Sequence, residues 1–326
     1  MKANSHSLFS TELVRPQQPA MTPALNARQT AEYLPWKALV NEIAAVLRDD
    51  SVRVAPRLVQ PLPGGGSLFV MPAIDRRVAI TKLITFTPGN PGKNKPAIQG
   101  DVVVFDIAAG ERRLLLDGPT VTGRRTAAVS VLAAQQLASN LEGPLLIIGA
   151  GVQGKAHLEA FAAVLDTKAC WIASRSLESA RALAQHAQTL GLQARVASDL
   201  GAALAACPLV VTCTPAHSIV LDRQPGASPR ADCFISAVGA FTPHMAELSP
   251  ALCRHFAEHG SIFVDSADAT HEAGDLLQAG LNVSQCQTLA QVVREIHTQR
   301  TGPVLFKSCG WAGWDLAAAR VALAAP

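Results

Sequence analysis

The periodicity of hydrophobic and polar positions changes after residue 139. Before it, short alternating runs are separated by Gly, Pro and Asn: RLVQPLP, GSLFVMPAI, VAITKLITF, GDVVVFDI and RRLLLDG. Alternation with a period of two is typical of strands with one buried face, so these runs predict an antiparallel sheet. A helical pattern over 25–47, interrupted by Pro35, precedes them. A long helix rich in Ala and Leu is predicted over 118–139.

Beyond this helix, uniformly apolar runs replace the alternation. PLLIIG, ACWIAS and QARVA are each followed by a helical segment, and PLVVTCT, CFISAVG and SIFVDS follow as further strands. Strands that alternate with helices at this spacing predict a parallel, doubly wound sheet. The last segment, 303–324, is predicted as a loop and a C-terminal helix. The fold class is therefore α/β.

Length and composition favour two domains with large cores. The chain has 326 residues, of which 49% are hydrophobic and 16% charged. A net charge of +3 gives no polybasic patch, so neither nucleic acid nor a membrane is an expected partner. Segment 1–26 lacks the apolar core of a signal peptide and is predicted to be a polar tail. Seven scattered cysteines without metal-ligand or redox spacing predict free thiols in the cytoplasm and no metal site.

A glycine-rich turn carries the first chemical signal. Gly149-x-Gly151-x-x-Gly154 follows a predicted strand and opens a helix within a βαβ unit. In dinucleotide-binding sites the first glycine permits the tight turn, the second lets the backbone approach the pyrophosphate, and the third allows close packing of helix on strand. The helix N-terminus then attracts the phosphates. An ordinary glycine turn is the alternative, and this context disfavours it.

The tip of the next strand bears on which dinucleotide binds. An acidic residue there would accept hydrogen bonds from the ribose 2′-OH of NAD. This strand instead ends in Ser174, Arg175 and Ser176, and Glu178 is already in the following helix. Arg pairs bidentately with phosphate oxygens, so the tip favours NADP(H). A solvated arginine at the start of a helix is the alternative interpretation of Arg175.

Three cations stand in the region of alternating runs. Arg57 lies in VAPRLVQPLP, Arg125 in TGRRTAAVSVL and Lys82 inside the apolar run VAITKLITF. A buried ammonium must reach solvent, pair with a counterion or serve a function. The pattern alone does not group the three residues, and a paired or solvated surface charge explains each one separately.

A family resemblance does group them. The segments PRLVQPLP, TKLITFTPGN, RRTAAVSVLAAQQLA, IIGAGVQGKAH, GDLLQAG and FKSCGWAGWDLAAA together resemble the ornithine cyclodeaminase/mu-crystallin family. The resemblance implies a homodimer in which a Rossmann-type domain (123–306) is inserted into a discontinuous α+β substrate-binding and dimerisation domain (1–122 and 307–326). It also implies that Arg57, Lys82 and Arg125 bind the substrate. The cofactor-binding residues that it implies are Arg125, Gly149, Gly151, Val152, Gln153, Gly154, Ser174, Arg175, Ser176, Thr214, Val238, Gly239, Ala240 and Ser308.

One departure from the family pattern separates reaction types. Cyclodeaminases carry an Asp after a Gly-Gly pair, where it acts on the substrate amine, whereas AVGAFTPHMAEL places Phe241 there. The family's ketimine reductase branch also lacks this Asp. The resemblance therefore implies reduction of cyclic imines, Δ1-pyrroline-2-carboxylate and Δ1-piperideine-2-carboxylate, to L-proline and L-pipecolate. NADPH is the expected cofactor, with NADH as a second candidate.

Lys82 is the candidate catalytic residue of this reaction. Two neighbouring arginines are expected to lower its pKa and make it a proton donor to the imine nitrogen, with water as the alternative donor. Two other functions stay open: an NAD-dependent ornithine cyclodeaminase and a non-enzymatic, NADPH-dependent binder of small molecules. His157, His244 and His271 match no functional position, so surface or hydrogen-bonding roles are expected for them.

Overall fold

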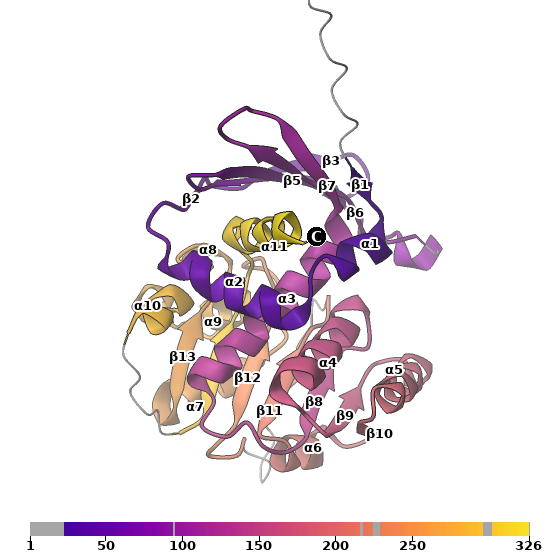
Figure 1. Cartoon of the computed structure of the whole chain (residues 1–326). Coiled ribbons are helices and arrows are strands. Elements are labelled where there is room, and N and C mark those ends of the chain that lie inside the picture. The colour runs from indigo at the N-terminus through magenta and orange to yellow at the C-terminus, as the bar shows by residue number, and fades with distance from the viewer. Residues whose placement is uncertain (1–22, 94, 216–217, 224–228, 296–301, 326) are drawn as a thin grey trace, which may run out of the picture.

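The computed structural model describes residues 23–93, 95–215, 218–223, 229–295 and 302–325 (Figure 1). An antiparallel sheet lies at the top of Figure 1 and a parallel sheet at the bottom, with helices between them. The N-terminal tail predicted from the sequence lies outside the described residues up to position 22. This two-sheet organisation agrees with the change from alternating to uniformly apolar runs in the sequence.

Within the described residues the first sheet has seven strands. Their order is β1-β7-β6-β5-β4-β2, with β3 also paired to β4. The five strands expected from the alternating runs are confirmed, and all pair antiparallel. The bounds are β1 Ala24–Leu25, β2 Arg53–Val54, β3 Leu58–Leu62, β4 Gly66–Ile74, β5 Val78–Phe86, β6 Ile98–Asp106 and β7 Arg112–Asp117, and a 3-10 turn, η1, covers Pro91–Lys93.

The register of this sheet places Lys82 on the buried face. Lys82 lies opposite Met71 on β4 and Val102 on β6, and all three are buried. Side chains opposite one another across strands share a face of the sheet. Helix α11 (Ala312–Ala324) packs against β4 and β5 on this face, so Lys82 points into the space between sheet and helix.

Helices α1 (Ala27–Glu32) and α2 (Trp36–Arg48) follow the predicted helical pattern and its interruption. Pro35 is the N-cap of α2, a place where the missing backbone N–H of proline costs no helical hydrogen bond. Helix α3 (Gly118–Leu137) starts after Asp117, whose side chain accepts a hydrogen bond from the Thr120 backbone N–H at 2.9 Å. Because α3 contacts both β6 and β12, it joins the two sheets.

The second sheet is parallel and doubly wound. Its order is β10-β9-β8-β11-β12-β15-β13-β14. From β8 the chain moves outward to β9 and β10, then returns to β11 on the other side of β8, so the direction reverses between β8 and β11. The bounds are β8 Leu145–Ile148, β9 Ala169–Ala173, β10 Gln193–Val196, β11 Leu209–Thr212, β12 Phe234–Ala237, β13 Ser261–Val264, β14 Gln287–Thr288 and β15 Val304–Lys307.

Helices cover this sheet in the alternating order that the sequence predicts for α4, α5 and α6. The bounds of the covering elements are α4 Val152–Leu165, α5 Leu177–Thr189, α6 Leu200–Ala206, α7 Pro250–His259, α8 Ala269–Glu272, α9 Gly274–Gln278, η2 Val283–Gln285 and α10 Leu289–Arg294. The sequence interpretation assigned no element to α7 through α10. Three of these helices have six residues or fewer, too short for a helical period to stand out.

The prediction of a loop at the start of 303–324 is wrong. Residues 304–307 form β15, a fully buried strand between β12 and β13, and only the helical part of the prediction, α11, is confirmed. VLFK is four residues long and ends in a lysine, so its local pattern is weak. Hydrogen-bonded neighbours on both sides make it a strand, and such neighbours are not visible in a local pattern.

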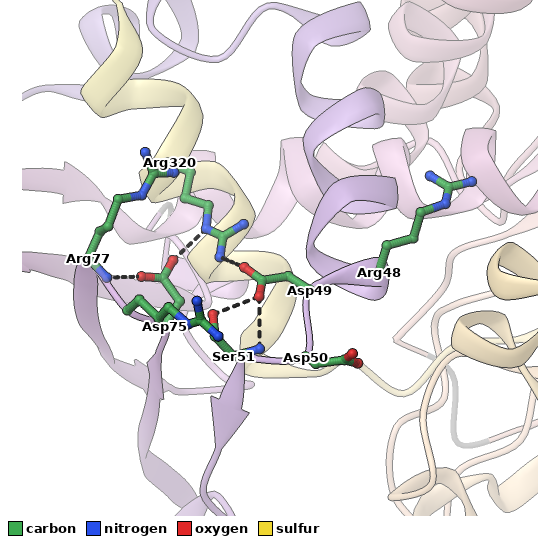
Figure 2. A pocket seen from close by; sticks show the side chains of 8 residues that line it. Arg48, Asp49, Asp50, Ser51, Asp75, Arg77 and Arg320 are labelled. Carbon is green, nitrogen blue, oxygen red and sulfur yellow. Dashed lines mark hydrogen bonds and ion pairs between the residues drawn. The ribbon is translucent and has the colours of Figure 1, made fainter.

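Arg320 links α11 to α2 and to the end of β4 by ion pairs. Its guanidinium forms ion pairs with Asp75 at 2.5 Å, Asp49 at 2.5 Å and Glu42 at 3.2 Å. Figure 2 shows Asp49 and Asp75 turned toward Arg320 in a surface pocket, while Arg48 points away. Every nitrogen of this guanidinium is paired, so the pocket offers no free charge from Arg320, and we interpret the cluster as structural.

The seven cysteines all lie in the described residues and are free, as predicted. Six of them are buried. Across the described part of the chain, no helix combines the length and the apolar character needed to cross a membrane.

Candidate active site

The residues predicted to face a cofactor gather along one edge of the second sheet. Gly149 follows β8, Ser174 follows β9, Thr214 follows β11, Val238 follows β12 and Ser308 follows β15. These strands are parallel neighbours, so their carboxyl ends meet at one edge. In doubly wound sheets, ligands bind at this edge beside the point where the strand order reverses.

The geometry of the glycine turn requires glycine at Gly149 and Gly154. Gly149 has φ of 119°, a left-handed conformation that favours glycine. A Cβ atom on Gly154 would lie 1.9 Å from the carbonyl oxygen of Gly149, so no larger residue fits there. Gly151 is the N-cap of α4, and a Cβ atom added there would have no neighbouring atom within 4 Å. The backbone of Gly151 is therefore open to a ligand at the start of the helix.

The second turn of α3 lies beside this glycine turn. The Gln153 side-chain amide donates to the Thr122 carbonyl oxygen at 3.5 Å, and a Cβ atom on Gly123 would lie 3.7 Å from the Val152 side chain. Thr122 Oγ1 and Gln153 Oε1 are buried and have no hydrogen-bond partner. Buried polar atoms normally have one, so these two atoms mark a place where a polar ligand fits.

Ser174, Arg175 and Ser176 form the turn between β9 and α5, as predicted. Ser176 is the N-cap of α5, and its hydroxyl accepts from the Ser179 backbone N–H at 3.2 Å. Arg175 is exposed, and no acidic residue stands between the end of β9 and the start of α5. The guanidinium is therefore available to an anion at this corner.

Lys82 and Arg125 meet on one carboxylate. Lys82 Nζ lies 2.9 Å from Asp315 Oδ2, and Arg125 Nε lies 3.3 Å from Asp315 Oδ1. Asp315 is fully buried and the side chains of Lys82 and Arg125 are 1% and 7% exposed. The three residues come from β5, α3 and the first turn of α11. The structure thus brings together two of the cations that the resemblance groups.

Arg57 completes the cluster. Its Nη2 donates to Glu272 Oε2 at 2.8 Å and to the Gly310 carbonyl oxygen at 2.5 Å. A Cβ atom on Gly310 would lie 3.3 Å from Nη1 of Arg125, so both guanidinium groups lie beside Gly310. We call Arg57, Lys82, Arg125, Glu272 and Asp315 the charged cluster.

The pKa values of two cluster members shift toward neutrality. Burial lowers the pKa of the Lys82 ammonium to about 8; Asp315 opposes this shift, and Arg125 and Arg57 add to it. The expectation that the arginines lower this pKa is correct in direction, although burial is the larger cause. Burial also raises the pKa of the Glu272 carboxyl to about 7, against the effect of Arg57 and with that of Asp268 and Asp265.

Two further buried carboxylates hold the sheet edge in place. Glu247 accepts from the Thr214 backbone N–H at 2.7 Å and from the Gly239 backbone N–H at 2.6 Å, which ties the end of β11 to the end of β12. Asp265 accepts from the Ser308 hydroxyl at 2.7 Å and the Gly310 backbone N–H at 2.7 Å. Both acids fix loops that carry predicted cofactor residues.

Sequence reasoning missed four acids: Asp315 and Glu272 of the charged cluster, and Glu247 and Asp265 at the sheet edge. Asp315 stands in FKSCGWAGWDLAAA, one of the segments that carry the family resemblance. Glu247 stands in AVGAFTPHMAEL, the segment that contains Phe241. The signal that could have found Asp315 was Lys82 itself, because a lysine in an apolar strand needs a counterion. Which acid supplies the counterion depends on tertiary packing.

Phe241 lies at the junction of the two sheets. Its ring packs edge-to-face on Phe86, the last residue of β5, with the centroids 6.0 Å apart. No proton can be exchanged with either ring. The loop after β12 therefore presents an apolar surface toward the first sheet.

The histidines have the roles expected for them. His157 is buried, with its ring nitrogens 2.9 Å from Ser130 Oγ and 2.8 Å from the Gln153 carbonyl oxygen, and burial lowers its pKa to about 4. His244 and His271 are exposed. No group of His, Cys, Asp and Glu side chains among the described residues could hold a metal ion.

Comparison with known proteins places the chain in a family. The family model described as ornithine cyclodeaminase/mu-crystallin family matches residues 24–323. Delta(1)-pyrroline-2-carboxylate reductase 2 of Burkholderia ambifaria is 38% identical over 304 residues, covering 92% of this chain and 94% of the relative. The Delta(1)-pyrroline-2-carboxylate/Delta(1)-piperideine-2-carboxylate reductase of Azospirillum brasilense is 38% identical over 305 residues, with the same coverage.

A solved structure shares the fold. Delta(1)-pyrroline-2-carboxylate reductase of Thermococcus litoralis, in complex with NADH and L-proline, superposes with a TM-score of 0.78 at 22% identity, over 91% of this chain and 92% of that one. The solved structure shows the shared fold, and the family model and the 38% identical relatives show the family. The chain belongs to the ornithine cyclodeaminase/mu-crystallin family.

Proposed function

We propose that the protein reduces cyclic ketimines that carry a carboxylate on the C=N carbon, using NADPH. The substrates would be Δ1-pyrroline-2-carboxylate and Δ1-piperideine-2-carboxylate, and the products L-proline and L-pipecolate. The observation that carries the proposal is the charged cluster beside the glycine turn, in a chain that is 38% identical to reductases of these two imines.

The residues present fit a nicotinamide dinucleotide. Gly151 leaves open backbone at the start of α4, and Thr122 Oγ1 and Gln153 Oε1 lack partners next to it. The proposed cofactor residues are those named from the sequence, Arg125 and the set from Gly149 through Ser308, and Arg175 would bind a 2′-phosphate. When bound, a reduced nicotinamide supplies the hydride.

The charged cluster would bind the carboxylate of the imine. With Lys82 protonated and Glu272 and Asp315 ionised, its three cations and two carboxylates leave one net positive charge, which matches a single carboxylate. Arg57 and Arg125 both lie beside Gly310 and would hold the two carboxylate oxygens, so that one face of the imine is presented.

Lys82 is our candidate proton donor. Its pKa of about 8 keeps most of the ammonium protonated at neutral pH and makes it a better acid than an exposed lysine. As hydride adds to the imine carbon, the proton from Nζ would pass to the nitrogen, and the lysine would be reprotonated from solvent. Asp315 would hold the ammonium in place during this transfer.

Phe241 favours reduction over cyclodeamination. A cyclodeaminase needs a group that accepts a proton from the substrate amine, and the phenyl ring, packed on Phe86, cannot do so. An apolar side chain here can help to exclude water from the hydride path.

The test combines four imine assays with an incubation with L-ornithine, all with purified protein. NADPH and NADH are each incubated with the five- and six-membered imines, and the absorbance of the reduced nicotinamide is followed. We expect consumption of NADPH with imine and no ammonia from L-ornithine. Ammonia released from ornithine without net change of cofactor would support the lyase instead, and inactivity in every reaction would support a binding protein.

We propose further that the protein is a homodimer in the cytoplasm, with domains of 1–122 plus 307–326 and 123–306. Leu58 and Leu83 are 54% and 45% exposed and lie in register with Val70 on the outer face of the first sheet, a surface that a second copy could cover. The free thiols support a reducing compartment. Light scattering of the purified protein measures the oligomeric state.

A further inference from the structure

Arg57 pairs with a carboxylate of its own chain. Its Nη2 donates to Glu272 Oε2 at 2.8 Å, and the two side chains are 14% and 22% exposed. Arg57 precedes β3 of the first sheet, whereas Glu272 ends α8, which follows β13 of the second sheet. The ion pair therefore spans the junction where the substrate would enter.

The two acids of the charged cluster are held very differently. Asp315 is fully buried and pairs with both Lys82 and Arg125. Glu272 is more exposed, ends a helix of only four residues, and pairs with one cation, Arg57, among the described residues. A carboxylate entering from solvent can displace Glu272 far more easily than Asp315.

We propose that Glu272 competes with the substrate carboxylate for Arg57. Glu272 occupies the guanidinium in the free enzyme, and the substrate displaces it on binding. This inference rests on the proposed function, because it takes Arg57 as part of the carboxylate clamp. Glu272 thereby makes entry selective, since only a ligand with an anionic group can replace the lost ion pair.

Competition of this kind makes binding depend on pH. Once Arg57 is taken by the substrate, Glu272 keeps its acidic neighbours Asp265 and Asp268 and loses its cation, so its pKa rises further above about 7. Turn η2, which packs against α8, carries no titratable side chain, and His271 is the exposed neighbour on α8 itself. Substrate binding therefore takes up a proton, and affinity falls as pH rises above about 7.

Glu272→Gln tests the competition directly. The probe is pyrrole-2-carboxylate, a planar carboxylate that cannot be reduced by hydride, and its binding to the protein with bound NADP+ is followed by calorimetry. In the wild type we expect binding to weaken between pH 6.5 and 8.5 and to take up protons, measured by comparing buffers of different ionisation enthalpy. In Glu272→Gln the proton uptake falls to the part that Lys82, with its pKa of about 8, contributes, and binding at pH 8.5 is about tenfold tighter than in the wild type.

Two controls separate competition from a structural role. Pyrrole-2-carboxamide has no charge to take over Arg57, so its binding should not tighten in Glu272→Gln. Asp268→Asn removes a neighbouring exposed acid that forms no ion pair with Arg57; proton uptake should persist, with its midpoint shifted to slightly lower pH. Equal proton uptake in the wild type and Glu272→Gln, or weaker carboxylate binding in the variant at pH 8.5, would overturn the proposal.

Failure of the proposed function has a different signature. A wild type that reduces neither imine contradicts the function and leaves the binding data to be judged separately. A wild type that reduces imines while both proteins bind the carboxylate with the same pH dependence contradicts only the role of Glu272.

Discussion

Lys82 keeps its charge in a buried position because of one neighbour. Its side chain is 1% exposed, and burial pushes its pKa down to about 8 against the pull of Asp315 at 2.9 Å. A buried ion pair is weak evidence for stability, since desolvation offsets most of the attraction. The pair instead bears on the proposed reaction, because it leaves an ammonium that can lose its proton near neutral pH.

Asp315→Asn should therefore move the pH profile. Asp315 raises the pKa of Lys82, so its loss lowers that pKa below about 8. The active, protonated lysine then disappears at lower pH, and the alkaline limb of the kcat profile shifts down by about one pH unit or more. Glu272→Gln is the matched control, because it should change KM and leave this limb in place. An unshifted limb in Asp315→Asn would show that Lys82 is not the titrating donor.

Arg175 is the residue on which cofactor preference depends in this account. Arg175→Ala removes a charge-assisted contact worth about 1.5–3 kcal/mol to a 2′-phosphate. We expect the KM for NADPH to rise about tenfold or more while the KM for NADH stays nearly constant. Arg181→Ala, which changes another exposed arginine in the following helix α5, should change neither value. Equal KM values for both cofactors in the wild type would refute the preference.

At the scale of elements, the strand ends were predictable and the partners of buried charges were not. Gly149, Ser174 and Thr214 follow strands whose apolar runs are local signals, so their shared edge follows from the parallel topology. Asp315 and Glu272 meet Lys82 and Arg57 only because α11 and α8 pack where they do. Pairings between residues this far apart in sequence leave no local pattern, and the burial of β15 between two strands is missed for the same reason.

Helix α11 carries Asp315 in its first turn, and its Arg320 forms an ion pair with Asp75. Arg320→Met leaves Asp75, whose side chain is 2% exposed, without its cation, so we expect a loss of about 3 kcal/mol in the free energy of unfolding at pH 7. Chemical denaturation measures it. Arg28→Met breaks the exposed pair with Glu32 and should change nothing measurable.

The same loss should depend on pH with a defined sign. Hydrogen bonds from Ser51 and Arg320 hold the pKa of Asp49 below its usual range. A lowered folded-state pKa stabilises the protein above the unfolded value, and that stabilisation is lost as pH falls through the folded value. The difference between wild type and Arg320→Met should therefore shrink below about pH 4. A difference that stays constant down to pH 3 would mean that packing, rather than charge, is responsible.

In the whole molecule, the two sheet regions would contribute different parts of the proposed site. The second sheet supplies the glycine turn and the strand ends, and the first supplies Lys82 and Arg57, with α3 and α11 between them (Figure 1). Cofactor and substrate would thus be bound by separate halves that meet at Gly310 and Phe241.

In the proposed reaction, hydride passes from the nicotinamide to the imine carbon of a substrate held by its carboxylate. The most direct measurement uses NADPH deuterated at C4, in its two stereospecific forms, with Δ1-pyrroline-2-carboxylate, followed by mass spectrometry and NMR of the product. We predict L-proline with one deuterium on C2 from one form of the cofactor and unlabelled L-proline from the other. No proline, or proline without deuterium on C2 from either form, would contradict the account.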